Sequence, residues 1–421
     1  MNRTKESFVF GFAIFASFFG AGNLILPPLL GFNAGSDWWL VAFGFIISAT
    51  VIPLLSLFAH ARLQGTMLDF GNKVSPIFSL VFCLCVYIIA IALPIPRTAA
   101  VTHEMSVSPF FNTSSLLTSS IYFIMVFLLA MNRGKVIQFI GKYLTPFIAL
   151  IVAAIIGVGI FMETPQMNPT IFKTPVVSGL LEGYQTYDAL AGLLSGGFVI
   201  ISLNLSNNYT FEDKKSIIAR SGFIAMMGLF LIYAGLIYIG ANFNTAFSTD
   251  ISRTELLSGL ALKTLGNTGS VFLSVLVSLA CFTTAVSVVV GTADFFMGLF
   301  KESKLAYIIA AVTACFIGIF VGQMDVSYII DVALPALMFI YPLSIVLIVL
   351  NVLPEKYASQ NVFKGVVLIT FLFSIPDFLS FLISTDALGD IKAVLPLSQF
   401  SLGWVLPALA TYIIINIVQK K

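Results

Sequence analysis

The first apolar run of the chain is interrupted by Gly20, Gly22 and Asn23. Pro27 and Pro28 follow, and this composition is unfavourable in mid-helix, so a helix break is predicted here. A helix that begins after such a break directs free N–H groups and a positive dipole end at the gap, which suits a carboxylate. Unwound carbonyl groups can hold a cation or an ammonium group. A glycine-lined packing face is the alternative, but it accounts for neither the asparagine nor the prolines.

A second interruption, Ser195, Gly196 and Gly197, lies in the middle of the sixth apolar run, at 186–205. If runs one to five form one repeat and runs six to ten another, each interruption falls in the first helix of its repeat. Five is odd, so the two repeats would cross a membrane in opposite directions. Glycine interruptions at matching positions point to a transporter's binding site. An amino acid, with both charges on one carbon, suits such a site, and the phenylalanine-rich surroundings favour an apolar side chain.

Two adjacent hydroxyl groups, those of Thr283 and Thr284, lie within the eighth apolar run. Hard cations prefer oxygen ligands, and Na⁺ is a hard cation. Two threonine hydroxyls and nearby backbone carbonyls are therefore a possible sodium site. In the alternative, each hydroxyl bonds to a carbonyl of its own helix, which is common in membrane helices. The residues alone leave both interpretations open.

Four ionisable residues beside or within apolar runs are candidates for coupling or gating charges: Arg97, Glu104, Asp188 and Asp331. Arg97 and Glu104 are seven residues apart, about two helical turns, and so share a helix face. Glu104, Asp188 and Asp294 could equally lie at the membrane interfaces in structural salt bridges. Asp331 is interpreted as the deepest acid and the best candidate for a proton-coupling carboxylate.

The elements that must position these residues are membrane helices. Of 421 residues, 59% are hydrophobic and 10% are charged, against roughly 25% charged in soluble domains. A spanning helix needs about 20 apolar residues. A cleaved signal peptide is the alternative for the first run, but that run continues through Asn23 to Leu30. We predict an all-α polytopic membrane protein with twelve transmembrane helices, at 8–30, 38–60, 76–100, 115–131, 136–161, 186–205, 217–240, 270–298, 305–322, 327–352, 362–383 and 400–418.

The positive charges predict the orientation of these helices, since cytoplasmic loops carry an excess of Lys and Arg. With both termini cytoplasmic, the outside segments hold only Lys173, Arg253, Lys263 and Lys392, and Arg97 lies near the membrane. The two longest polar intervals, 162–185 and 241–269, fall outside and are expected to hold short surface helices. The cytoplasmic segments hold the other sixteen cations: Arg3, Lys5, Arg62, Lys73, Arg133, Lys135, Lys142, Lys214, Lys215, Arg220, Lys301, Lys304, Lys356, Lys364, Lys420 and Lys421.

Several classes of function are excluded by what the sequence contains. The net charge of +2 argues against nucleic acid as a partner. Two histidines are too few for a metal site, and no hydrolase elbow, phosphate loop or Walker motif is present, which excludes an enzyme and ATP-driven transport by this chain. The energy must come from an ion gradient or the solute's own gradient. Four cysteines lie in apolar runs and are interpreted as small buried hydrophobes: Cys83, Cys85, Cys281 and Cys315.

Four segments, at 19–28, 95–101, 183–190 and 281–286, resemble in order the motifs of the branched-chain amino-acid transport system II carriers, the LIVCS family. The resemblance covers effectively the whole chain. It implies a sodium- or proton-coupled symporter for leucine, isoleucine and valine in the bacterial inner (plasma) membrane. It also implies the LeuT fold, with discontinuous first and sixth helices, inverted repeats at 1–161 and 162–352, and accessory helices at 353–421. Na⁺ would be the coupling ion, with H⁺ as the alternative, and no other cofactor is expected.

The resemblance also implies a distribution of site residues. Sodium symporters of this fold place a cation between the first-helix break and an Ala-x-x-Thr-Ser/Thr pattern, which residues 280–284 match. The implied sodium ligands are the carbonyls of Ala16, Phe19 and Ala280 and the hydroxyls of Thr283 and Thr284. The substrate carboxylate would meet the backbone of Ala21, Gly22 and Asn23, and the ammonium group the carbonyls near Ser195, Gly196 and Gly197, with Phe198 as a pocket wall.

Three other kinds of membrane protein are the alternatives: a carrier with another ion or substrate range, a sensor and a channel. A proton-coupled carrier or a carrier of broader neutral amino acids would use the same cavity. An amino-acid sensor would share the pocket without moving its ligand, but receptors usually carry a soluble signalling domain. A channel would need a continuous polar stripe along several helices. This sequence shows neither feature.

Overall fold

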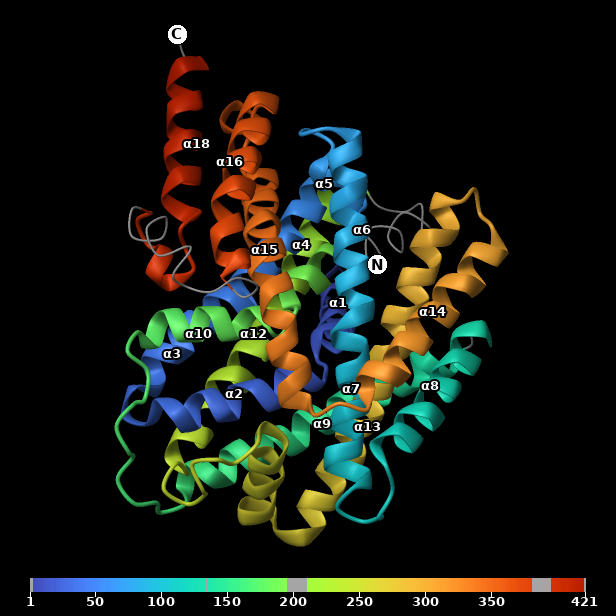
Figure 1. The fold of residues 1–421 in the computed structure, drawn as a ribbon, viewed down its shortest axis with the longest axis vertical. Coiled ribbons are helices and arrows are strands. Elements are labelled where there is room, and N and C mark those ends of the chain that lie inside the picture. Colours follow the sequence, from blue (N-terminus) through green and yellow to red (C-terminus); the bar gives the residue numbers. More distant parts are fainter. Residues whose placement is uncertain (1–2, 133–134, 195–209, 381–394, 420–421) are drawn as a thin grey trace.

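The helices of the computed structural model follow the apolar runs of the sequence (Figure 1). The structure describes residues 3–132, 135–194, 210–380 and 395–419, and these contain helices and no strands, as expected for an all-α protein. The first half comprises α1 (Arg3–Phe18), α2 (Ala21–Ala34), η1 (Gly35–Asp37), α3 (Trp38–Ile46), η2 (Ile47–Val51), α4 (Ile52–Leu63), α5 (Met67–Gly71), α6 (Pro76–Ala92), α7 (Pro94–Thr102), η3 (His103–Val107), α8 (Ser115–Asn132) and α9 (Lys135–Phe161).

The second half contains the longest helices. Of these, α13 bends at Gly266, whose φ of +71° is accessible to glycine without steric cost. Its elements are α10 (Pro175–Tyr184), α12 (Phe211–Asn242), α13 (Arg253–Leu299), α14 (Lys304–Gly322), α15 (Val326–Val352), η4 (Glu355–Tyr357), α16 (Gln360–Leu379), η5 (Ser398–Phe400) and α18 (Val405–Gln419).

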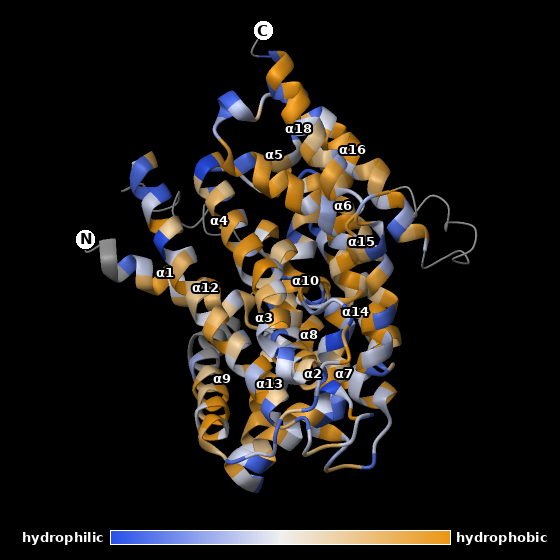
Figure 2. Cartoon of the chain, turned by 90° about the vertical axis from the view of Figure 1, so that its left-hand side faces the viewer, coloured by the Kyte–Doolittle hydropathy of each residue, from blue (hydrophilic) through white to orange (hydrophobic). Residues whose placement is uncertain are grey.

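Many of these helices can cross a membrane. In the described residues, eight helical segments are long and apolar enough to span it, and three shorter apolar helices accompany them. Large apolar side chains point outward from several helices, including Ile77 on α6, Leu150 on α9, Leu305 on α14 and Val418 on α18. Figure 2 shows orange, hydrophobic residues along the outer helices α9, α16 and α18. Exposed apolar surface on this scale marks contact with lipid.

The predicted interruption of the first run coincides with the gap between two helices. α1 ends at Phe18 and α2 begins at Ala21, and Gly20 between them is extended, with φ −116° and ψ −173°. Pro27 and Pro28 lie inside α2, which continues past them to Ala34. The break therefore lies at the glycine and asparagine side of the motif, seven residues before the prolines.

The sixth helix begins earlier than the sequence predicts. The interval 162–185 is predicted to lie outside, where it could hold short surface helices, but its helix α10 packs against α3 and ends at the fully buried Tyr184. This packing is close because a Cβ at Gly44 would overlap the carbonyl of Val176, and one at Gly179 the carbonyl of Val41. Small residues on both helices thus allow the two backbones to touch. α10 is the first part of an interrupted helix, not a surface element.

The interruption that follows α10 lies at 185–187, and residues 188–194 are helical again. Predicted interruption residues Ser195, Gly196 and Gly197, and the predicted pocket wall Phe198, lie outside the described residues. Figure 1 shows α2 and α10 near mid-height, and the long helix α15 runs beside α10.

The core is built around α2 and α12. Gly31 of α2 faces the carbonyl of Ile237, and Gly240 of α12 faces the carbonyl of Pro28, so the two backbones are in direct contact. α1 runs along the other part of α12, where Ser221 Oγ donates to the carbonyl of Ser7 over 3.0 Å. Through these contacts α12 holds both helices that flank the first break.

Candidate functional site

A cavity of about 90 Å³ lies between the two helix breaks. α2 contributes Gly22 and Asn23, and the second break contributes Thr186 and Tyr187. Besides the charged groups described below, its wall is largely apolar. The lining residues are Ser17, Phe18, Gly20, Gly22, Asn23, Val86, Ala90, Pro94, Arg97, Thr98, Thr186, Tyr187, Asp188, Leu190, Ala191, Leu194, Thr284 and Val288.

The two breaks are joined by the side chains of Asn23 and Asp188. Asn23 Nδ2 donates to Asp188 Oδ1 and Oδ2 over 2.9 and 3.0 Å. The hydroxyl of Tyr233, on α12, donates to Asp188 Oδ2 over 2.6 Å and also contacts Asn23 Nδ2. All three side chains are buried. Asn23 Oδ1 in turn accepts from the N–H of Gly20 over 3.4 Å, so the same side chain braces the first break.

The second break is built by a threonine and a left-handed residue. Thr186 Oγ1 donates to the carbonyl of Gly183 over 2.8 Å and accepts from the N–H of Asp188 over 3.2 Å. One hydroxyl thereby satisfies backbone groups on both sides of the gap. Tyr187 has φ +64°, which turns the chain so that a new helix starts at Asp188. The carboxylate at this helix N-terminus is favoured by the helix dipole.

Arg97 reaches the cavity from α7, which Pro94 sets off from α6. Its side chain is 5% exposed, and its Nη1 donates to the carbonyl of Gln185 over 2.7 Å. The guanidinium carbon lies 5.2 Å from the ring centroid of Tyr187, a cation–π contact. On the other side, a Cβ at Gly22 would collide with the guanidinium. Arg97 therefore lies between the two breaks, against one carbonyl and one glycine.

The candidate sodium ligands are only partly brought together. Thr284 lines the cavity, and its Oγ1 lies 3.4 Å from the position of a Cβ on Gly20. Thr283 Oγ1 donates to the carbonyl of Ala280 over 3.0 Å, which is the bond expected from the alternative interpretation. Ala16 lies in the last turn of α1, and Phe19 follows its end, in the break. Elsewhere in the described chain, no three His, Cys, Asp or Glu residues form a metal-binding group.

Glu104 and Asp331 lie away from the cavity. Glu104, on η3, accepts from Thr254 Oγ1 over 2.6 Å and from the N–H of Val326 over 2.8 Å. It does not share a partner with Arg97, and it joins the starts of α13 and α15. Asp331 is exposed on the second turn of α15. Among the acids discussed, Asp188 is the one that lines the cavity.

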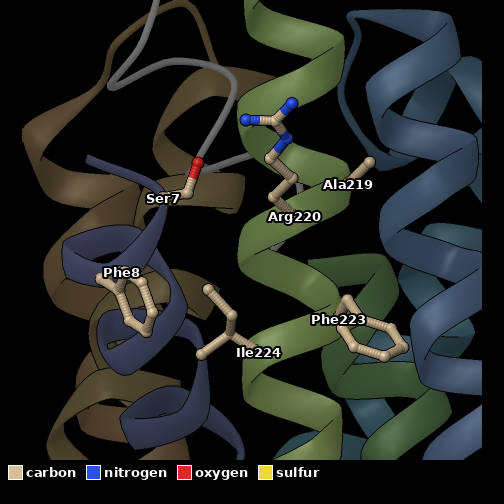
Figure 3. A pocket seen from close by; sticks show the side chains of 6 residues that line it. All are labelled: Ser7, Phe8, Ala219, Arg220, Phe223 and Ile224. Atoms are coloured by element: carbon tan, nitrogen blue, oxygen red, sulfur yellow. The ribbon is translucent and has the colours of Figure 1, made fainter. Parts of the chain in front are cut away.

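Two further pockets lie outside the cavity. One, of about 360 Å³, is lined by Glu182, Gln185 and Arg253 among others, and the ion pair of Arg253 Nη1 with Glu182 Oε1 spans 2.9 Å. Because the carbonyl of Gln185 binds Arg97, this residue stands between that pocket and the cavity. The other, of about 370 Å³, lies between α1 and α12 and is lined by Ser7, Phe8, Ala219, Arg220, Phe223 and Ile224 (Figure 3).

Sequence reasoning missed Tyr233 and the break at 185–187, and the break that it predicted at 195–197 lies outside the described residues. A tyrosine within an apolar run is ordinarily a core residue, so its pattern carries no signal of a buried acid beside it. The available signal was polar: Gln185, Thr186 and Asp188 lie in the segment 183–190, which resembles a family motif but contains no glycine or proline at the gap itself. Cys83, Cys281 and Cys315 are buried, as predicted, whereas Cys85 is only partly buried.

The fold is that of LeuT-like transporters. Mhp1, in an inward-facing conformation, superposes with a TM-score of 0.63 over 98% of this chain and 90% of that chain, at 12% identity. The manganese transporter of Eremococcus coleocola, in complex with an aromatic bis-isothiourea compound, gives a TM-score of 0.59 over 99% and 95%, at 14% identity. At these identities the likeness is one of fold.

Sequence comparison then gives the family. The model of the family described as branched-chain amino acid transport protein matches residues 3–421, and the chain belongs to this family. The branched-chain amino acid transport system 2 carrier protein of Pseudomonas aeruginosa is 32% identical over 94% of this chain and 92% of its own length. The branched-chain amino acid permease BraB of Bacillus subtilis is 32% identical over 97% and 94%.

Proposed function

We propose that the protein is a secondary active symporter that imports leucine, isoleucine and valine by alternating access, coupled to Na⁺. The observation that carries this proposal is the cavity that residues of both helix breaks line. Broken helices expose backbone groups at membrane depth, where no water competes for them. The apolar part of the wall, Val86, Ala90, Leu190, Leu194 and Val288, suits a branched aliphatic side chain.

In this proposal the chain has twelve transmembrane helices, with two inverted five-helix repeats at 1–161 and 162–352 and accessory helices at 353–421. The two breaks support it, since one follows α1 and the other follows α10, at the start of each repeat. Both termini would lie in the cytoplasm and the protein in the bacterial plasma membrane, in accord with the distribution of Lys and Arg.

The sodium ion would lie between the first break and α13. Its ligands would be the carbonyls of Ala16, Phe19 and Ala280 and the hydroxyls of Thr283 and Thr284. The approach of Thr284 to Gly20 supports this placement, since it puts a hydroxyl beside the unwound backbone. A cation bound there would hold the first helix break and α13 together before the substrate binds.

The substrate would bind on the other side of the break. Its carboxylate would meet the free N–H groups of Ala21, Gly22 and Asn23, at the positive end of α2. Its ammonium group would meet carbonyl groups of the interrupted sixth helix. This arrangement presents both charges of an amino acid to backbone groups and its side chain to the apolar wall.

Substrate competition in proteoliposomes tests the proposal. The reconstituted full chain should take up radiolabelled leucine, and unlabelled isoleucine and valine should compete, whereas lysine and glutamate should not. External leucine should also drive counterflow of label that is already inside. Binding of leucine with no counterflow would instead identify a sensor, and equal competition by small neutral amino acids a broader carrier.

A further inference from the structure

The cavity contains one cationic and one anionic side chain in an otherwise neutral lining. Arg97 is 5% exposed and Asp188 is 1% exposed, and every other lining residue is uncharged. Within the described residues no salt bridge joins the two. A buried charge is costly unless an opposite charge or hydrogen bonds compensate it. Arg97 and Asp188 share a cavity without forming an ion pair, so a ligand that carries one charge of each sign can compensate both side chains at once.

Arg97 retains most of its capacity to donate hydrogen bonds. A guanidinium has five N–H donors in a planar fork, and within the described residues one hydrogen bond, to the carbonyl of Gln185, uses them. The Nη2 end of the guanidinium lies against Gly22, in the first turn of α2. The fork is thus next to the positive end of a helix dipole, and both features favour the same anion. A carboxylate is the planar partner that such a fork binds with two parallel bonds.

Asp188 is held by neutral donors only. Asn23 and Tyr233 supply three hydrogen bonds to its two oxygens, whereas a carboxylate has about four lone-pair sites. These bonds fix the orientation of the group but place no cation in direct contact with it, and the charge of Arg97 acts on the carboxylate only across the cavity. An ammonium group can supply that cation, and its three N–H donors need acceptors of this kind.

We propose that Arg97 binds the carboxylate of the transported amino acid and Asp188 its ammonium group. This inference rests on the proposed function and deepens it by assigning substrate charges to side chains as well as to backbone. The two groups line one cavity of about 90 Å³, so a ligand can reach both only if its charges are close together, as on an α-carbon. The pair selects zwitterions against aliphatic acids and aliphatic amines of the same shape.

Ligand stabilisation of the purified full chain tests the assignment. Three probes of similar shape are compared in the same sodium buffer: leucine, leucinamide, which lacks the carboxylate, and 4-methylpentanoate, which lacks the ammonium group. Apparent affinities come from the shift of the melting temperature with ligand concentration. Wild type should prefer leucine to both analogues.

The variants should lose these preferences separately. Arg97→Gln should reduce the preference for leucine over leucinamide about tenfold to a hundredfold, as expected for a charge-assisted hydrogen bond, and keep most of the preference over 4-methylpentanoate. Asp188→Asn should do the reverse. Arg62→Gln is the matched control, because Arg62 also donates to backbone carbonyls, those of Val352 and Leu353, outside the cavity.

Two results overturn the assignment. One is an Arg97→Gln or Asp188→Asn protein whose preferences equal those of wild type. The other needs no variant and applies even if both variants fail to fold: wild type that binds leucinamide and 4-methylpentanoate as tightly as leucine. Failure of the proposed function is distinct from both, since wild type would then either bind none of leucine, isoleucine and valine or bind leucine without counterflow in proteoliposomes.

Discussion

The amide of Asn23 and the carboxylate of Asp188, 165 positions apart in the chain, connect the two helix breaks of this transporter. The distances from Asn23 Nδ2 to the carboxylate oxygens are 2.9 and 3.0 Å, and both residues are buried. Asn23 lies in the first turn of the helix after the first break, and Asp188 begins the helix after the second. The contact therefore fixes the relative position of the two segments that line the cavity.

Mutation of Asn23 and Asp188 should be strongly non-additive. Asn23→Ala leaves the Asp188 carboxylate with fewer donors, which we expect to cost about 1–3 kcal/mol and to lower the melting temperature. Asp188→Asn removes the charge that needs those donors, so the double variant should lose less than the two single losses combined. As a control, Asn23→Ala combined with Asn242→Ala should be additive, since Asn242 bonds to Thr164 and Gly159 instead. Additive losses for the first pair would contradict the contact.

Gly22→Ala should abolish transport with little loss of stability. The added Cβ would collide with the end of the Arg97 side chain, which can move away and leave its place beside α2. We expect leucine uptake to fall more than tenfold while the melting temperature stays within a few degrees of wild type. Two glycines provide controls, each read by uptake and melting temperature. Gly291→Ala has nothing nearby and should be neutral, whereas Gly31→Ala meets the Ile237 backbone and should unfold the protein. A Gly22→Ala protein that transports normally would show that Arg97 is not needed at this position.

Glu104→Gln should reduce stability without changing the ion dependence of transport. The carboxylate of Glu104 accepts from Thr254 and Val326, and an amide can accept at one of its two positions only. A loss of about 1–3 kcal/mol follows, to be measured as a lower melting temperature. Glu355→Gln is the control, because its ion pair with Lys73 is 3.6 Å long and largely exposed. An altered sodium or proton requirement in Glu104→Gln would instead give this residue a role in coupling.

Thr284→Ala should raise the sodium concentration needed for half-maximal uptake by about tenfold, equivalent to roughly 1.4 kcal/mol of sodium binding. The variant removes a hydroxyl beside the first break but keeps the helix. Thr370→Ala serves as the control, since Thr370 is a buried threonine of α16 whose hydroxyl donates to the carbonyl of Val366. An unchanged sodium requirement in Thr284→Ala would exclude this hydroxyl as a ligand.

The first break could be predicted from sequence because its cause is local. Gly20 adopts an extended conformation and Asn23 braces it from one turn away, so composition alone marks the place. The eighth apolar run and its threonines were likewise visible as polar groups in an apolar segment. In both cases the signal and the structure lie within a few residues of each other.

The second break could not be placed in the same way because its cause is tertiary. Gln185, Thr186 and Tyr187 include no glycine, and the gap depends on the Thr186 hydroxyl, on the left-handed Tyr187 and on Arg97 from another helix. The burial of α10 depends on small residues of α3, such as Gly44, 135 positions before Gly179. Packing between segments that are far apart in the chain cannot be recognised from a short stretch of sequence.

The central claim, sodium-driven import through the cavity between the two breaks, is tested most directly by leucine uptake into proteoliposomes. The reconstituted protein is given an inward sodium gradient, or an equal gradient of choline, each with and without a protonophore. We expect uptake above the equilibrium level with the sodium gradient and not with the choline gradient. The protonophore should leave uptake in sodium unchanged. Unchanged uptake in choline would contradict sodium coupling, and its loss on addition of the protonophore would identify the proton as the coupling ion.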